Sequence, residues 1–423
     1  MDEIVSQYVP HDIENICGYE NWRNEFYTAQ GHMSRSIVYV VPPDFVRGYA
    51  DILTGLTTTF LLALLTRRNF HVYWRDGERV WQEKLPNMFI DTLAEDWRTE
   101  AYDLVDIPNH ARRSYPEYSK LWGDGMLHLD DDESWQFYRY VDFDEVFAEK
   151  ETTYIMSNRG QIYGAYENPI YRSRLTNMIQ DPDHAFGCLL HALFRPKPSI
   201  FRHFNRTFLR TILKQKHLIG IHVRVGDSLI THYKKHYNNN ELELMRLFAN
   251  VWKCATEISE ERIRRIRSET STSFLSSFSG YSKNITWLVV SDSVDLRRVL
   301  ESSLPKYYNV LIPNVTSNIG HTGTGDFSCQ YKTCSAPPSM TTSDERLMYL
   351  EIAVAEHWFL SMTNRLIISR NSGFSKTAGF LGLLKNRMFA SGQKANSKLD
   401  ESNPCVSENS ASMLDMGSDL AHI

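Results

Sequence analysis

The sequence contains little cysteine. Six cysteines in 423 residues are too few for a disulfide scaffold, and none belongs to a Cys-x-x-Cys pair of the zinc or redox kind. Cys329 and Cys334 lie close together, and the sequence leaves open whether they form a bridge or remain two thiols. The stability of the fold must therefore come mainly from a hydrophobic core.

The sequence also lacks a long hydrophobic run. Its first thirty residues are polar, which predicts neither a signal peptide nor a membrane anchor at this end. The most apolar stretch, Ile52–Leu65, is about 14 residues long, short of the roughly 20 that span a bilayer. We therefore predict a buried helix there. Sequons at Asn205, Asn284 and Asn314 fit passage through a secretory lumen.

No charge of one sign dominates. Lys and Arg total 46 and Asp and Glu total 51, a net charge of −5, so the overall electrostatic footprint of a nucleic-acid-binding protein is missing. Hydrophobic residues make up 42% and aromatic residues 12%, as in ordinary globular proteins. A chain of this length predicts about two domains.

Apolar strands alternate with helices in both halves of the sequence. A strand at 37–41, a helix from about Asp51 and a strand at 70–74 form one βαβ pattern. Beyond 195–198 the alternation is clearer, and it predicts a parallel sheet buried on both faces. The predicted elements there are strands at 218–223, 287–291, 310–313 and 366–369, and helices at 241–258, 294–302, 344–361 and 375–384.

These patterns predict an α/β protein with two Rossmann-like domains that face a cleft. The N-terminal domain covers residues 1–198 and the C-terminal domain residues 199–390. The Ser- and Asn-rich segment 391–423 is expected to be a disordered tail. Residues 257–283 read as a surface insertion that starts as a charged helix, and 314–343 as a long loop of the kind that covers substrates.

The segment Ile219–Asp227 joins several reactive side chains to the end of one strand. His222 and Arg224 share a face of that strand, because side chains alternate with a period of two. Arg224 can donate two hydrogen bonds to a phosphate, Gly226 permits close backbone approach, and Asp227 can hold the guanidinium in place. A buried structural Arg–Asp pair is the alternative.

A second candidate site is the start of the last predicted helix. Ser372, Gly373, Phe374 and Ser375 follow a strand and open that helix, where free amides and the helix dipole attract an anion. An ordinary serine cap explains the same residues. Two candidate anion sites at the ends of strands of one sheet together favour a site for a diphosphate.

Asp292 ends a third strand, where it can accept a hydrogen bond from a ribose or base, or can cap the next helix. The sequence has no Gly-x-Gly-x-x-Gly after a strand, no Gly-x-Ser-x-Gly and no His pair with metal-ligand spacing. A nucleotide-diphosphate donor site is what remains.

In order and spacing, these segments resemble the fucosyltransferase superfamily, and within it the α1,2, α1,6 and xyloglucan type. The resemblance rests on 48–67, the His222-Val-Arg224 motif, the strand that ends at Asp292, and the segment from Ser369 to Ser375. It spans roughly residues 36–385. The first loop departs from many relatives, with Gly48-Tyr49-Ala50 in place of Gly-x-Gly.

The resemblance implies a GT-B fold, GDP-fucose as the donor, inversion at the anomeric carbon, no metal or other cofactor, and a Golgi or secretory location. It implies that Arg224 binds the β-phosphate, His222 the nucleoside side and Asp292 the guanosine. Ser372–Ser375 would hold the pyrophosphate. Asp51 is the candidate general base, although a cap of its own helix explains it equally well.

We therefore predict an enzyme that transfers fucose from GDP-fucose to a hydroxyl of a glycan or glycoprotein acceptor, without nucleic acid as a partner. Two alternatives remain. One is a protein O-fucosyltransferase, and the other is an inactive relative that binds glycans or nucleotides.

Overall fold

The computed structural model describes residues 13–29, 33–41, 49–74, 89–91, 122–123, 126–129, 133–157, 160–224, 248–269, 285–292, 294–303, 308–313, 343–369, 372–384, 388–391 and 405–407. The chain divides into two compact units. We call the described part of Val9–Lys197 the N-terminal unit and that of Pro198–Asn409 the C-terminal unit. Gly226, Asp227, Cys329 and Cys334 lie outside the described residues.

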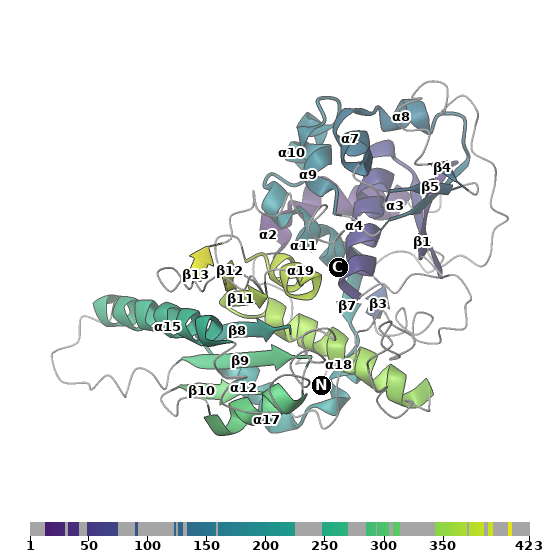
Figure 1. Cartoon of the computed structure of the whole chain (residues 1–423). Helices are drawn as coiled ribbons and strands as arrows, with labels where there is room; N and C mark the ends of the chain where they lie inside the picture. The colour runs from purple at the N-terminus through teal and green to yellow at the C-terminus, as the bar shows by residue number, and fades with distance from the viewer. Residues whose placement is uncertain are drawn as a thin grey trace. The chain divides into compact units, whose positions relative to one another are not determined.

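The N-terminal unit is built on a five-stranded sheet of order β2-β1-β6-β5-β4. Its strands β1, β4 and β5 are labelled in Figure 1. The sheet is parallel apart from the pair β4 and β5, and β3 pairs with β7 separately. The elements of this unit are α2 (Ile13–Cys17), η2 (Tyr19–Asn21), α3 (Arg23–Ala29), β1 (Ser36–Val41), α4 (Tyr49–Thr66), β2 (Asn69–Trp74), β3 (Phe89–Asp91), β4 (Trp122–Gly123), β5 (Met126–His128), α7 (Glu133–Tyr140), α8 (Phe143–Val146), β6 (Thr152–Met156), α9 (Ile162–Glu167), α10 (Arg172–Met178), α11 (Pro182–Leu193) and β7 (Phe194–Pro196).

Helix α4 is the central helix of the N-terminal unit. It is long and apolar enough to cross a membrane, but 94% of that stretch is buried inside the protein. Its threonines bond back to the helix itself, as Thr57 Oγ1 does to Leu53 O at 2.8 Å, so their hydroxyls are satisfied without water. The predicted buried helix at Ile52–Leu65 is thus confirmed.

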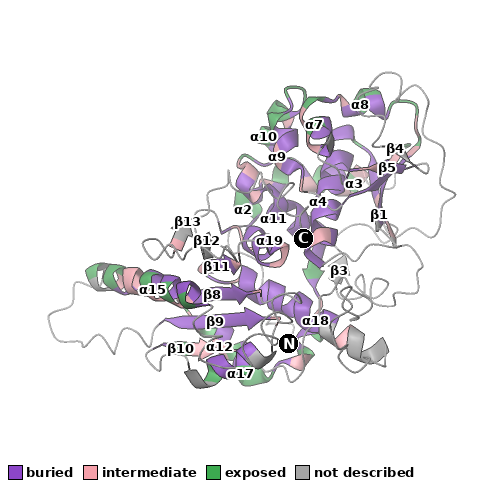
Figure 2. Cartoon of the chain, viewed as in Figure 1, coloured by how far each residue is buried: buried purple, intermediate pink, exposed green. Residues whose placement is uncertain are grey.

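The C-terminal unit is built on a six-stranded sheet of order β10-β9-β8-β11-β12-β13, parallel except for the last pair. Its central strands and α18 are buried throughout most of their described length (Figure 2). The elements are η6 (Pro198–His203), α12 (Arg206–Lys214), β8 (Leu218–Val223), α15 (Ala249–Glu269), β9 (Thr286–Ser291), α17 (Val294–Ser303), β10 (Asn309–Leu311), α18 (Ser343–Ser361), β11 (Arg365–Ser369), α19 (Gly373–Leu381), β12 (Met388–Ser391) and β13 (Cys405–Ser407).

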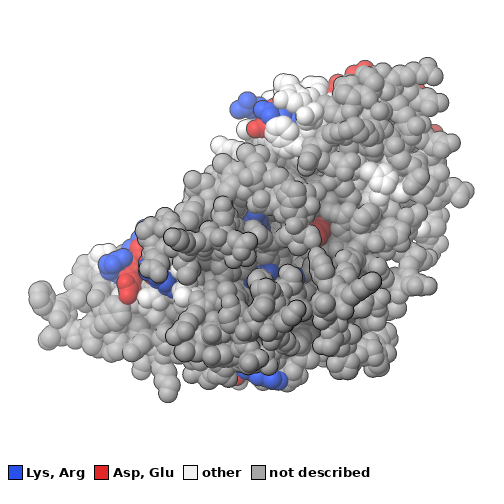
Figure 3. All heavy atoms as spheres, in the orientation of Figure 1, with Lys and Arg blue, Asp and Glu red and all other residues white. Residues whose placement is uncertain are grey.

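Helix α15 is longer than predicted. The sequence predicts one helix that ends at Ile258 and a charged helix that begins at 257, whereas both belong to the single helix α15, which continues to Glu269. Its second half is charged, and Glu261 pairs with both Arg265 and Arg365. Blue and red atoms accordingly lie side by side over α15 in Figure 3. Pairs at i,i+4 stabilise a solvated helix whose residues supply little apolar surface.

The prediction of a disordered tail from residue 391 is wrong for the described part of that segment. Ser391 ends β12, and Cys405–Ser407 form β13, antiparallel to β12. Cys405 is also bonded to Cys254 of α15. A covalent bond and a strand ladder hold a segment whose composition alone favours disorder, and both partners lie far away in the sequence.

Candidate donor site at the carboxyl edge of the second sheet

Strand β8 lies at the middle of the second sheet and presents two different faces. Ile219, Ile221 and Val223 belong to the apolar cluster that α15 and α17 complete. The side chains of His222 and Arg224 are on the opposite face. Gly220 precedes them on this face, and a Cβ there would lie 2.8 Å from both Leu366 and Thr363. A side chain at this position would have to displace the ends of the Leu366 and Thr363 side chains.

Arg224 follows β8 at the carboxyl edge of the sheet. Its Nε lies 3.2 Å from Asp292 Oδ2, and Asp292 follows the end of β9. Its backbone N–H donates to Ser369 Oγ at 2.8 Å, and the Ser369 hydroxyl donates to the carbonyl of His222 at 2.9 Å. The sequence suggested Asp227 as the partner of this guanidinium. The partner within the described residues is Asp292.

His222 is a neutral, buried imidazole. Burial lowers its pKa to about 3, because water no longer solvates the charged ring; Asp292 opposes this effect and Arg224 adds to it. Its Nδ1 is buried and has no hydrogen-bond partner among the described residues. Native proteins rarely leave a buried polar atom unsatisfied unless a ligand or water completes it. His222 can therefore offer a neutral hydrogen bond to a bound molecule.

The start of α19 lies against β8. The Phe374 ring is 5.3 Å from the His222 ring and 5.1 Å from that of His357. Ser372 occupies the cap position with extended backbone, but its side chain makes no capping hydrogen bond. The hydroxyl of Ser372 therefore does not cap α19. Amides of the first helical turn have no partner within the helix, so a bound anion can accept from them.

Ser375 differs from its neighbours in this segment. It is completely buried, and its hydroxyl lies 3.4 Å from the carbonyl oxygen of Ser372. Gly373 is the first residue of α19 and is partly exposed. Ser372 is also buried, at 6% exposure, so Gly373 and Phe374 are the partly exposed members of this predicted segment.

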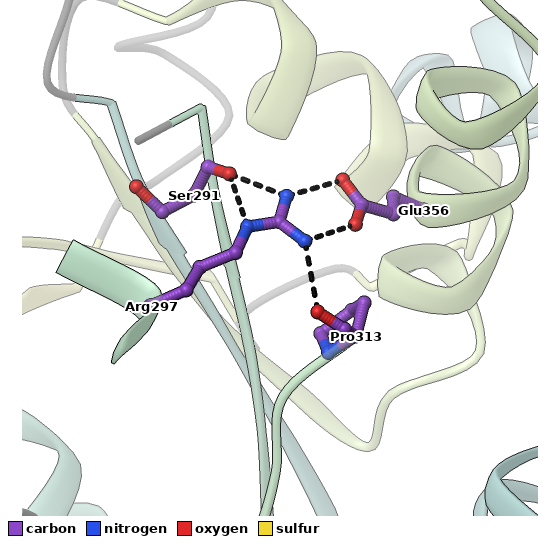
Figure 4. Close-up of polar contacts among 4 residues, drawn as sticks. All are labelled: Ser291, Arg297, Pro313 and Glu356. Carbon is purple, nitrogen blue, oxygen red and sulfur yellow. Dashed lines mark hydrogen bonds and ion pairs between the residues drawn. The ribbon is translucent and has the colours of Figure 1, made fainter. Parts of the chain in front are cut away.

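A buried ion pair that sequence reasoning missed supports the end of β9. Arg297 of α17 donates from both terminal nitrogens to Glu356 of α18, at 2.7 and 2.9 Å (Figure 4). It also donates through Nε to Ser291 O at 2.7 Å and through Nη1 to Pro313 O at 3.2 Å. Burial raises the pKa of Glu356, and Arg297 opposes this rise.

The sequence contains one signal of this pair. Glu356 interrupts an apolar run in a helix, and a carboxylate in such a place needs a buried partner. The identity of that partner was not visible, because Arg297 lies on a different helix and adjoins a second arginine, Arg298.

Asp51 belongs to the N-terminal unit and is partly exposed. Helix α4 begins at Tyr49, so Asp51 lies within its first turn and is not the cap residue. A carboxylate in a first turn interacts favourably with the helix dipole. The residues described above belong to the C-terminal unit alone.

The geometry at this sheet edge suits an anionic ligand. It combines a partly exposed guanidinium, the amides at the start of a helix, a serine hydroxyl that makes no capping hydrogen bond, and a neutral imidazole. In open α/β sheets, ligands bind at the carboxyl ends of the strands. A fixed cation together with helix-end amides can stabilise charge that builds on a departing diphosphate.

No model of a known protein family matches the sequence, and no curated protein matches it. The structure does match solved structures. A mutant of the Arabidopsis thaliana fucosyltransferase FUT1 in complex with GDP superposes with a TM-score of 0.57 at 15% identity, over 96% of this chain and 81% of that one. The chain has the fold of this fucosyltransferase.

The fucosyltransferase NodZ from Bradyrhizobium is similar at a TM-score of 0.43 and 15% identity, over 88% of this chain and 97% of that one. A second NodZ structure, an α-1,6-fucosyltransferase soaked with GDP-fucose, gives a TM-score of 0.39 at 15% identity over the same shares. The α/β fold of GT-B type predicted from the sequence is confirmed. The arrangement of two domains that face a cleft stays a prediction.

Proposed function

We propose that the protein is an inverting fucosyltransferase that uses GDP-fucose as its donor and a glycan hydroxyl as its acceptor. The observation that supports this most is Arg224, placed beside Asp292 and Ser369 at the carboxyl edge of the sheet. It occurs in a chain with the fold of a fucosyltransferase that was solved with GDP.

In this proposal the C-terminal unit binds the donor and the N-terminal unit serves the acceptor. Arg224 and the first-turn amides of α19 stabilise the negative charge that develops on GDP when the bond from fucose to phosphate breaks. Ser372 and Gly373 contact the pyrophosphate. Gly226 and Asp227, which lie outside the described residues, keep the roles that the sequence suggests, close backbone approach for Gly226 and support of the guanidinium for Asp227. His222 contacts the nucleoside side as a neutral group, because its pKa of about 3 leaves it uncharged near neutral pH.

Asp51 is our candidate for the general base that takes the proton of the acceptor hydroxyl. A carboxylate suits this role when it lies within hydrogen-bond reach of that proton.

We also propose a secretory or Golgi location. Each unit contains a disulfide bond, Cys17–Cys188 in the first and Cys254–Cys405 in the second. Structural disulfides form and persist in oxidising compartments and are rare in the cytosol. The sequon at Asn205 agrees with this location, because Asn205 is exposed at the start of α12.

A transfer assay with labelled GDP-fucose and a glycan array tests the proposed activity, with GDP-mannose as the control donor. We expect transfer from GDP-fucose, and a loss of at least about a hundredfold in Arg224→Ala because a cation that stabilises the leaving group is removed. Arg210→Ala, which removes an exposed arginine from α12, is the matched control and should retain activity.

Calorimetry with GDP separates the alternatives. Binding without transfer would favour an inactive nucleotide-binding relative. Transfer to folded protein domains but not to free glycans would favour protein O-fucosylation. Absence of GDP binding, or binding unchanged in Arg224→Ala, would contradict the donor site.

A further inference from the structure

Arg224 is held from both neighbouring strands of the sheet. The order β9-β8-β11 places β8 between the other two. From the β9 side, Asp292 forms an ion pair with Nε of Arg224 at 3.2 Å. From the β11 side, the Ser369 hydroxyl accepts from the backbone N–H of Arg224 and donates to the carbonyl of His222. One contact fixes the backbone and the other fixes the guanidinium.

The Ser369 contact continues the sheet where the strand ladder stops. The register of β8 with β11 runs through Arg365–Ile219, Leu366–Gly220 and Ile367–Ile221. Beyond it, a side-chain hydroxyl links β11 to the carbonyl of His222 and the amide of Arg224. The end of β8, from His222 to Arg224, is therefore bonded to Ser369 of β11 at two backbone atoms.

The Asp292 contact leaves the phosphate-binding part of Arg224 available. Asp292 pairs with Nε, and in the described part of the chain the two Nη groups make no hydrogen bond or ion pair. Those two groups form the donor pair that a guanidinium presents to a phosphate. The Arg224 side chain is 30% exposed, whereas that of Asp292 is 12% exposed, so the carboxylate lies deeper than the cation.

The backbone just before Asp292 is held by hydrogen bonds. Arg297 donates a hydrogen bond to the carbonyl oxygen of Ser291, the residue before Asp292, and another to the carboxylate of Glu356 (Figure 4). Arg297 and Glu356 are buried, with exposed fractions of 4% and 2%. The end of β9 is thus anchored to α17 and α18 before it reaches Arg224.

We propose that Asp292 and Ser369 are positioning residues that preorganise Arg224 for the diphosphate of the donor. Asp292 then acts on diphosphate binding through Arg224 and makes no contact with the base. This role replaces the guanosine contact that the family resemblance implies for Asp292. It rests on the proposed function, since it requires that a nucleoside diphosphate binds at Arg224.

Inorganic pyrophosphate distinguishes the two roles of Asp292, because it has no nucleoside. Calorimetry of the full chain with GDP and with pyrophosphate should show that Asp292→Ala weakens both ligands by the same factor, about tenfold. Glu301→Ala removes an exposed carboxylate from α17 and is the matched control, with no change expected. A loss of GDP affinity with unchanged pyrophosphate affinity would overturn the proposal in favour of base recognition.

A double-mutant cycle tests whether Asp292 acts through Arg224. We expect Asp292→Ala to have no further effect on pyrophosphate binding in an Arg224→Ala background, because coupled residues are not additive. Full additivity of the two losses would overturn the proposal. Circular dichroism of each variant confirms that the fold is retained, and Asp292→Asn, which preserves shape, replaces Asp292→Ala if that variant does not fold.

The hydroxyl of Ser369 is tested in the same assay. Ser369→Ala should weaken pyrophosphate several-fold, and Ser369→Thr, which keeps the hydroxyl, should restore most of the affinity. Equal affinities in the wild type and Ser369→Ala would overturn the role of Ser369. If the wild type binds neither GDP nor pyrophosphate, the proposed function itself fails. If it binds both and every Asp292 and Ser369 variant binds equally well, the positioning role fails alone.

Discussion

At the scale of single residues, the candidate site depends on charges and hydrogen bonds that burial has altered. His222 and His357 are both buried, and desolvation lowers the pKa of each to about 3. Neither ring is therefore charged in the folded protein near neutral pH. Arg224 remains the partly exposed cation beside His222.

The low pKa of His222 predicts an acid-sensitive fold. Its folded pKa of about 3 lies below the ordinary value of 6.5, so the unfolded chain binds the proton first as the pH falls. Stability is complete above about pH 6.5 and declines toward pH 3, by up to about 1.4 kcal/mol per pH unit for each such histidine. Urea unfolding at pH 7, 6 and 5 should show a smaller decline in His222→Asn than in the wild type. Identical declines would contradict the buried neutral ring.

At the scale of elements, helix α4 is packed against Ser157, the residue after β6, with no space left at Gly55. A Cβ at Gly55 would lie 1.8 Å from the carbonyl oxygen of Ser157 and 2.9 Å from the hydroxyl of Tyr39. The Tyr39 hydroxyl donates to that same carbonyl at 3.1 Å. The helix, β1 and the end of β6 therefore meet at one backbone oxygen.

This contact predicts that Gly55→Ala destabilises the protein. Alanine favours a helix over glycine by about 1 kcal/mol, but here the added methyl must displace backbone, which costs about 1–3 kcal/mol or more. Gly164→Ala in α9 is the matched control, because its Cβ would meet Tyr138 Cβ at 3.1 Å and no backbone oxygen as closely. Denaturant unfolding should show the larger loss for Gly55→Ala, and the reverse order would contradict the close packing.

The ion pair between α17 and α18 predicts that removing one partner costs more stability than removing both. Glu356→Ala leaves the buried Arg297 without its carboxylate, so we expect a loss of about 3–5 kcal/mol in the free energy of unfolding. The double variant Arg297→Met with Glu356→Leu removes both charges and should lose less, because no unpaired charge stays buried. Chemical unfolding of both variants checks this. A double variant less stable than Glu356→Ala would show that the pair itself contributes net stability.

At the scale of the whole molecule, each unit has its own disulfide with a long sequence separation. Cys17–Cys188 spans 171 residues, and Cys254–Cys405 spans 151. Closing loops of this length restricts the unfolded chain. The second bond also attaches β13 to α15, so it decides whether the end of the described chain belongs to the fold.

Removal of either disulfide should destabilise the unit that contains it. We expect Cys254→Ser with Cys405→Ser to lower the free energy of unfolding by about 2–4 kcal/mol, and the same for the other pair. Dithiothreitol should lower the stability of the wild type in thermal unfolding but should have little effect when the four cysteines of these two bonds are replaced. Equal sensitivity of that variant to the reductant would contradict the assigned bonds.

The sequence by itself determined the local elements, because periodicity and strand-end residues act within a few positions. The alternation predicted β8, β9 and β11 close to their observed bounds, the buried helix α4, and the place of His222, Arg224 and Asp292 at strand ends. The division was wrong in α15, where the predicted apolar helix and the predicted charged helix are continuous.

Only the tertiary structure decided which of these residues meet. The pairing of Arg224 with Asp292, the contact with Ser369, the buried Arg297–Glu356 pair and both disulfides join residues that are far apart in the sequence. Such partners depend on strand order and helix placement, which no local pattern encodes. The short strand β13 is the clearest case: the composition of the segment 391–423 around it favours disorder, and a bond to α15 and a ladder to β12 make the strand part of the sheet.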